Sequence, residues 1–147
     1  MTTRLFVPVL CVLVIACNPP AGPPLTISKM VVLEPLPGTN VTAAYLTLDN
    51  NSNQPIAIEK VTSPQFARVT MHETVIQDEV ARMVSLAPLI IDRQSIVRFE
   101  PGGKHLMMSD PPQEVTLGLP VTVEFHYDIN GLLIVTTTVS SRDDLPE

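Results

Sequence analysis

From residue 26 onward, short runs rich in Val, Ile, Thr and Leu alternate with clusters of turn-forming residues. Such runs predict β-strands. The expected strands are residues 27–34, 41–49, 55–62, 66–76, 80–86, 95–100, 114–117, 121–128 and 132–139. Fifteen prolines and the scarcity of an i, i+3, i+4 apolar period argue against long helices. We therefore expect an all-β fold, a Greek-key sandwich or barrel, with a hairpin at Asn130-Gly131.

The first 17 residues have the layout of a secretory signal. One basic residue, Arg4, precedes an apolar run from Leu5 to Ala16, which is too short to span about 30 Å of hydrocarbon comfortably. The run ends in Val14-Ile15-Ala16-Cys17, which resembles the lipobox of bacterial lipoproteins. That resemblance implies that Cys17 is lipidated and becomes the first residue of the mature protein. An ordinary cleavage site or a short membrane anchor is the alternative.

Residues 18–24, Asn-Pro-Pro-Ala-Gly-Pro-Pro, form a proline-rich stretch. This composition favours polyproline II and predicts a semi-rigid spacer. We therefore expect a signal peptide at 1–16, a tether at 17–25 and one β domain at 26–142. By resemblance to lipoproteins of the enteric type, Asn rather than Asp after the cysteine implies sorting to the outer membrane. The expected location is the cell envelope, in the periplasm, with a lipid anchor.

Charge and cysteine content exclude several classes of protein. The formal net charge of -6 lacks the basic footprint that a nucleic-acid partner requires. Two cysteines, Cys11 and Cys17, cannot build a disulfide-rich scaffold or a zinc site of four thiolates. Because Cys11 lies in the signal and Cys17 would carry lipid, we expect no free thiol in the mature domain. No Ser–His–Asp arrangement, phosphate-binding loop or pair of carboxylates stands out, so we expect no enzyme.

Two of the three histidines lie close to methionines. His105 and Met107 are two residues apart, so their side chains leave an extended segment on the same face. His72 and Met83 flank an expected turn at Gln77-Asp78. A hairpin whose paired residue numbers sum to 155 would place His72 directly opposite Met83. The two His–Met pairs could therefore converge on one ion.

The ligand types indicate which ion this would be. Thioether sulfur is soft and neutral and suits Cu(I), whereas imidazole accepts Cu, Zn, Fe or Ni. The set lacks the thiolates and carboxylates common in zinc sites, and it lacks the cysteine of a blue-copper centre. Neutral ligands near the surface should also release the ion to a stronger acceptor. We therefore expect a carrier of one Cu(I) per chain rather than an electron-transfer protein.

The spacing of these residues resembles that of the PCu(A)C periplasmic copper chaperones. The pattern in that family is H-x10-M-x21-H-x-M. Here ten residues separate His72 from Met83, and twenty-one residues separate Met83 from His105-Leu106-Met107, so the spacing matches. The flanking segments that are also similar are Ala43–Leu48 before an Asn-rich turn, Met71–Thr74 and Pro101–Gly103. The resemblance covers roughly residues 26–140, which is almost the whole mature domain.

The resemblance implies a cupredoxin-like β fold and Cu(I) bound by His72, Met83, His105 and Met107. It further implies delivery of copper toward assembly of cytochrome c oxidase, notably its dinuclear copper centre. The expected partners are a copper-accepting protein, either an oxidase subunit or another assembly factor, and the membrane that holds the lipid anchor.

Each of these side chains has an ordinary structural interpretation when taken alone. A lone Met usually fills a gap in a core, and a lone His usually lies at the surface or in a hydrogen bond. Met71 and Met108 neighbour the expected ligands but point to the opposite face, so we expect both to pack, with an auxiliary role left open for Met108. His126 is expected to be structural or exposed. The alternative functions are a structural or adhesive β-sandwich lipoprotein of the envelope and a copper store or Cu(II) buffer.

Overall fold

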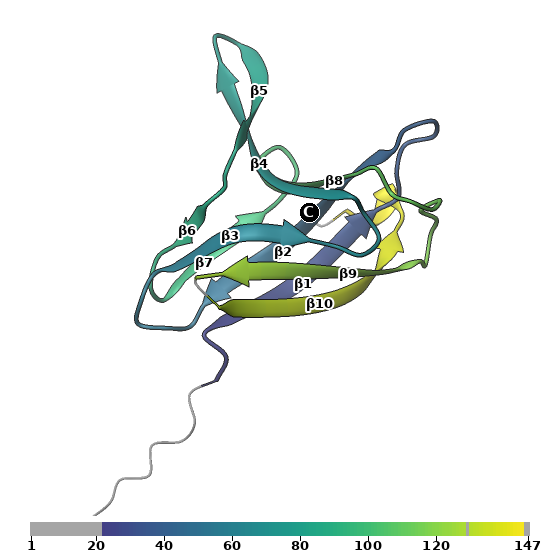
Figure 1. Cartoon of the computed structure of the whole chain (residues 1–147). Coiled ribbons are helices and arrows are strands. Elements are labelled where there is room, and N and C mark those ends of the chain that lie inside the picture. The colour runs from purple at the N-terminus through teal and green to yellow at the C-terminus, as the bar shows by residue number, and fades with distance from the viewer. Residues whose placement is uncertain (1–21, 129, 146–147) are drawn as a thin grey trace, which may run out of the picture.

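A computed structural model of the chain describes residues 22–128 and 130–145 (Figure 1). Its elements are β1 (Leu25–Leu33), β2 (Val41–Asn50), β3 (Ile56–Thr62), β4 (Arg68–Gln77), β5 (Val80–Ser85), β6 (Leu89–Ile91), β7 (Ser95–Phe99), β8 (Lys104–Ser109), β9 (Pro120–Tyr127), β10 (Gly131–Ser140) and the 3-10 helix η1 (Arg142–Asp144). The all-β prediction is confirmed. The expected signal peptide and the lipidation site at Cys17 lie outside the described residues. Within the described ranges, no helix is long and apolar enough to cross a membrane.

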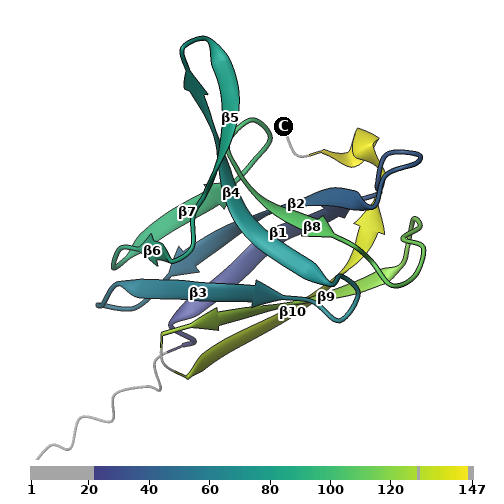
Figure 2. The ribbon, with the colours of Figure 1, turned by 45° about the horizontal axis from the view of Figure 1, so that its top comes forward.

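The strands form one mixed sheet that curls into a half-barrel (Figure 2). Its order is β5-β4-β8-β2-β1-β10-β9-β3-β6, and β7 pairs with β2 beside the end of β8. Neighbouring strands are antiparallel except β1 and β10, which are parallel and pair Val32 with Val139. The two antiparallel halves therefore join at β1 and β10, and β5 and β6 end the strand order.

The core lies inside the curl and is built from alternating residues of the strands. On β9, Val121, Val123 and Phe125 are fully buried, while the residues between them are partly exposed. The β9–β10 hairpin expected from the Asn-Gly pair is confirmed, with Tyr127 paired with Gly131. A Cβ at Gly131 would overlap the ring of Tyr127, so a larger residue there would have to displace that ring.

The structure contains two short strands that were not predicted from the sequence, and it lacks one strand that was predicted. Residues 114–117 are a coil and turn rather than a strand, because Gly118 has φ +79° and Leu119 N–H donates to the Thr116 carbonyl. The missed strands are β6, which has three residues, and β8. β8 lacks β-branched residues, and it forms a strand because β4 and β2 pair with it on both sides.

Candidate metal centre

Strands β4 and β8 bring the two histidines together. Their antiparallel register places His72 directly opposite His105. The imidazole centroids are 6.0 Å apart and the rings are tilted by 35°. An ion bound by both Nε2 atoms, with metal–nitrogen bonds of about 2.0 Å, can bridge this separation. The pair therefore has the geometry of a site for one metal ion.

Met107 lies on the same face of the sheet as the two histidines. It is two residues beyond His105 on β8, and its register partner on β4 is Thr70, which shares the face of His72. The intervening Leu106 is fully buried, so the His-bearing face is the outer surface of the half-barrel. Three of the four expected ligands therefore converge on one patch of the outer face.

Hydrogen bonds fix the orientation of both imidazoles. His105 Nδ1 lies 3.1 Å from the carbonyl oxygen of Gly103, which can only accept, so Nδ1 carries the proton. The same carbonyl accepts the Thr74 backbone N–H at 3.1 Å and is therefore held in place. His72 Nδ1 contacts Thr70 Oγ1 at 3.3 Å. This tautomer leaves the Nε2 lone pair of His105 available for a metal, which is the usual arrangement around metal-ligating histidines.

The surroundings of His72 favour its neutral form. Burial, and secondarily the nearby His105, hold the pKa of His72 below its ordinary value of 6.5. The next residue pair of β4 and β8 is Glu73 with Lys104. Lys104 Nζ donates to Glu73 Oε1 at 2.7 Å, so these two charges offset each other. A metal ion entering at neutral pH therefore meets a lone pair on His72 rather than a bound proton.

The expected position of Met83 was wrong by two residues. Met83 is opposite Thr74, and His72 is opposite Ser85. The turn is at Asp78 and Glu79, both with positive φ (52° and 61°), one residue later than expected. Since the shift is even, Met83 keeps the face of His72 but becomes its diagonal neighbour, roughly 7 Å away.

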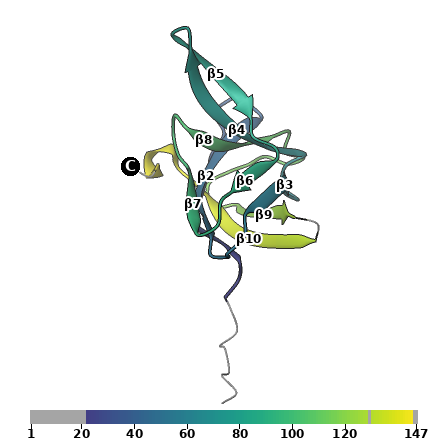
Figure 3. The ribbon, with the colours of Figure 1, turned by 90° about the vertical axis from the view of Figure 1, so that its left-hand side faces the viewer.

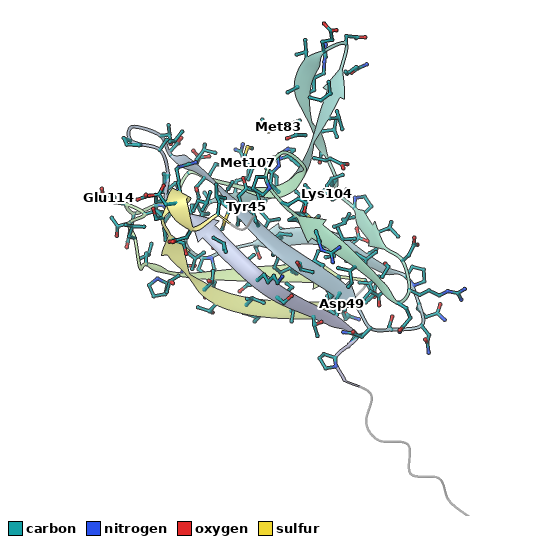
Figure 4. The ribbon with its side chains drawn as sticks, turned by 180° about the vertical axis from the view of Figure 1, so that it is seen from behind. Tyr45, Asp49, Met83, Lys104, Met107 and Glu114 are labelled. Atoms are coloured by element: carbon teal, nitrogen blue, oxygen red, sulfur yellow. The ribbon has the colours of Figure 1, made fainter. Side chains whose placement is uncertain are left out.

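The side chain of Met83 is 62% exposed and lies on the β4–β5 hairpin, while Met107 lies on the body of the sheet (Figure 4). Methionine has three rotatable bonds, which gives its sulfur a wide reach. The structure thus brings His72, His105 and Met107 together and places Met83 at the edge of their patch.

The other His and Met residues near these strands pack or form hydrogen bonds. Met71 and Met108 are buried in the core, as expected from strand alternation, and Met108 faces away from the patch. His126 Nε2 lies 3.0 Å from Thr62 Oγ1 and 3.9 Å from Glu124 Oε2 on the other half of the sheet. Within the residues that the structure describes, no three His, Cys, Asp or Glu side chains form a metal cluster.

Tyr45 shares the outer face, and the sequence patterns assigned it no role. Its strand β2 pairs with β8 so that Ala43 faces Met107, and Tyr45 follows two residues later on the same side. Burial raises the pKa of the Tyr45 phenol, and the Arg142 guanidinium offsets part of this shift. The phenol is therefore neutral at physiological pH. The sequence signal for this position is the two-residue period of the strand, because Leu46 and Leu48 lie on the buried face and Tyr45 and Thr47 therefore lie on the outer face.

Comparison with known proteins identifies the family of the chain. A family model described as "Putative lipoprotein LpqE-like" matches residues 25–139. The chain belongs to the LpqE-like family. An uncharacterized protein, RP573 of Rickettsia prowazekii (strain Madrid E), is 29% identical over 101 residues. That match covers 68% of this chain and 56% of the relative, so the chain spans little more than half of the relative's length.

Solved structures share the fold of the LpqE-like chain. The copper-bound PCuAC domain from PmoF2 has a TM-score of 0.66 at 19% identity, over 82% of this chain and 96% of that domain. Cu(I)-bound DR1885 from Deinococcus radiodurans has a TM-score of 0.63 at 24% identity, over 80% of this chain and 77% of DR1885. Apo-DR1885 aligns over 99% of both chains, with a TM-score of 0.62 at 23% identity. The fold implied by the sequence resemblance is therefore confirmed.

Proposed function

We propose that this LpqE-like protein is a Cu(I) metallochaperone that carries one copper ion per chain. Its ligands would be His72, Met83, His105 and Met107. The observation that carries this proposal is the direct pairing of His72 with His105, with rings 6.0 Å apart and Met107 on the same face. The proposal also draws support from the PCu(A)C-like spacing and from a fold shared with a copper-bound PCuAC domain.

The donor chemistry of the patch suits transport rather than catalysis. Two imidazole nitrogens and two thioether sulfurs carry no charge, so the bound ion keeps its single positive charge. His105 Nε2 is held in place by the Gly103 carbonyl, whereas Met83 lies on an exposed strand. An incoming ligand would therefore displace Met83 first and leave the histidines until last. Copper stays Cu(I) throughout, and no electron is exchanged.

Competition with a chromophoric Cu(I) chelator tests the ligand set. Loss of a ligand should weaken binding by more than about tenfold, because even loss of a group supporting a ligand costs roughly that much. We expect this loss for His105→Ala and Met83→Ala. His126→Ala is the matched control, because His126 lies on the other half of the sheet. Binding as tight as in the native protein for either ligand variant would contradict the assignment.

The anchor and the destination of the copper are further parts of the proposal. The lipobox-like residues ending in Cys17 and the family's lipoprotein description support a lipid anchor in the envelope, which we place in the outer membrane. Cys17→Ser should move the protein from the membrane fraction to the soluble fraction, and unchanged fractionation would contradict the anchor.

For the destination of the copper we propose the dinuclear copper centre of cytochrome c oxidase, on the basis of the resemblance to the PCu(A)C chaperones. No copper transfer to the apo soluble copper domain of oxidase subunit II would contradict that destination.

A further inference from the structure

The β4–β5 hairpin extends beyond the body of the sheet (Figures 1 and 3). The last rung that β4 shares with β8 is Glu73 with Lys104. From Thr74 to Gln77, β4 pairs with β5, and all six residues of β5 are exposed. The hairpin is therefore a projecting arm whose outer strand is a free edge of the sheet.

The two faces of this arm differ in their relation to the candidate metal centre. Ile76 is paired with Ala81, and Met83 is paired with Thr74, on the face that carries His72. Ile76 is 72% exposed and Met83 is 62% exposed. We call Ile76, Ala81 and Met83 the site-face patch. The opposite face also carries exposed apolar residues, Val80 at 54% and Val84 at 41%, so what distinguishes the site-face patch is that it contains Met83.

Neither the fold nor the metal ligands account for the exposure of Ile76. Its side chain contributes little to the core, and a thioether ligand at Met83 does not need an isoleucine beside it. Exposed apolar clusters often mark interaction surfaces, and free edge strands are normally protected by charges or prolines. On β5 the only charged residue is Arg82, which lies on the opposite face.

We propose that the site-face patch is the docking surface for the protein that receives the copper. This inference rests on the proposed function, because it assumes that Met83 holds Cu(I). Ligand exchange requires a donor atom of the acceptor to come within bonding distance of the ion. Since Met83 lies within the patch, an acceptor that reaches the ion from this side also covers Ile76.

Charge indicates the chemistry of the acceptor. Asp78 and Glu79 are exposed at the tip of the arm, and the whole chain has a net charge of -6. A complementary acceptor presents an apolar rim around its copper ligands and basic residues facing the tip. A second copy of this chain fits less well, because it would bring the same net negative charge.

Stopped-flow copper transfer from the Cu(I)-loaded chain to the apo soluble copper domain of cytochrome c oxidase subunit II tests the docking surface. Ile76→Thr keeps a β-branched residue but removes apolar area, and Val80→Thr makes the matched change on the opposite face. We expect Ile76→Thr to slow second-order transfer about tenfold, as loss of a well-buried interface contact would. Val80→Thr should transfer within about twofold of the native rate, since exposed positions outside an interface contribute little. The rate at which a small chelator removes copper should be the same in both variants as in the native protein, because a small chelator does not need the docking surface.

Asp78→Asn tests the charge argument, because asparagine tolerates the positive φ at this turn. It should slow transfer at low salt and have little effect at high salt. Equal effects of Ile76→Thr and Val80→Thr, a native rate for Ile76→Thr, or no transfer from the native chain would overturn the docking proposal. Copper-dependent dimers that Ile76→Thr abolishes would assign the patch to a second copy and also overturn it. Failure of the native chain to bind Cu(I) would instead overturn the proposed function.

Discussion

Met107 and Met108 are adjacent on β8 but point to opposite sides of the sheet. Met108 is fully buried in the core, and Met107 is partly exposed on the outer face beside His105. Truncating each residue to alanine should therefore have separate consequences. Met107→Ala should impair copper binding with little effect on folding, and Met108→Ala should do the reverse.

The magnitudes follow from burial. Truncating a fully buried Met removes packed methylene groups and sulfur and leaves a cavity, which costs about 2–5 kcal/mol. Met108→Ala should lower the free energy of unfolding by this amount. Met107 has less apolar area to lose, so Met107→Ala should cost under about 1 kcal/mol. Met107→Ala should lower the Cu(I) affinity by more than about tenfold, whereas the Cu(I) affinity of folded Met108→Ala should stay within about twofold of the native value.

Urea unfolding followed by far-UV circular dichroism measures the first quantity, and chelator competition measures the second. The chain has no tryptophan, so fluorescence is a poor probe of its unfolding. A Met108→Ala protein that folds but binds Cu(I) as weakly as Met107→Ala would refute the assignment of the two faces. Equal destabilisation by both substitutions would refute it as well.

Three further predictions concern protons and supporting hydrogen bonds. Burial and the nearby His105 hold the pKa of His72 below 6.5, so Cu(I) affinity should weaken as the pH falls through the pKa of His72 and this imidazole binds a proton. Titration at stepped pH would measure this loss of affinity. Thr70→Val removes the hydroxyl 3.3 Å from His72 Nδ1 and should weaken Cu(I) binding about tenfold in chelator competition. Thr62→Val removes the hydroxyl that contacts His126, so it should cost about 1 kcal/mol in urea unfolding and leave Cu(I) affinity unchanged.

Much of the fold follows from local sequence, because β-branched runs and turn residues act over short distances. The hairpin at Asn130-Gly131 is an example, since its turn chemistry lies within the residues that form it. β8 could not be found in this way. Its sequence, Lys-His-Leu-Met-Met-Ser, has no strong strand preference, and pairing with β4 and β2 makes it a strand.

In the candidate metal centre, too, some features follow from local sequence and others depend on the pairing of distant strands. The shared face of His105 and Met107 follows from strand alternation, which sequence spacing encodes directly. The pairing of His72 with His105 depends on β4 and β8 being neighbours, and no local pattern contains that information. The position of Met83 depends on which two residues form the turn, and Asp78-Glu79 lacks the glycine that normally identifies a type I′ turn.

X-ray absorption at the copper K-edge of the Cu(I)-loaded protein tests the central claim most directly. With one Cu(I) per chain, we expect a shell of nitrogen neighbours at about 2.0 Å from two imidazoles and sulfur neighbours at about 2.3 Å from two thioethers. His105→Ala should remove nitrogen scattering, and Met107→Ala should remove sulfur scattering. A copper shell without sulfur, or one that neither substitution changes, would contradict the assignment of His72, Met83, His105 and Met107 as the copper ligands.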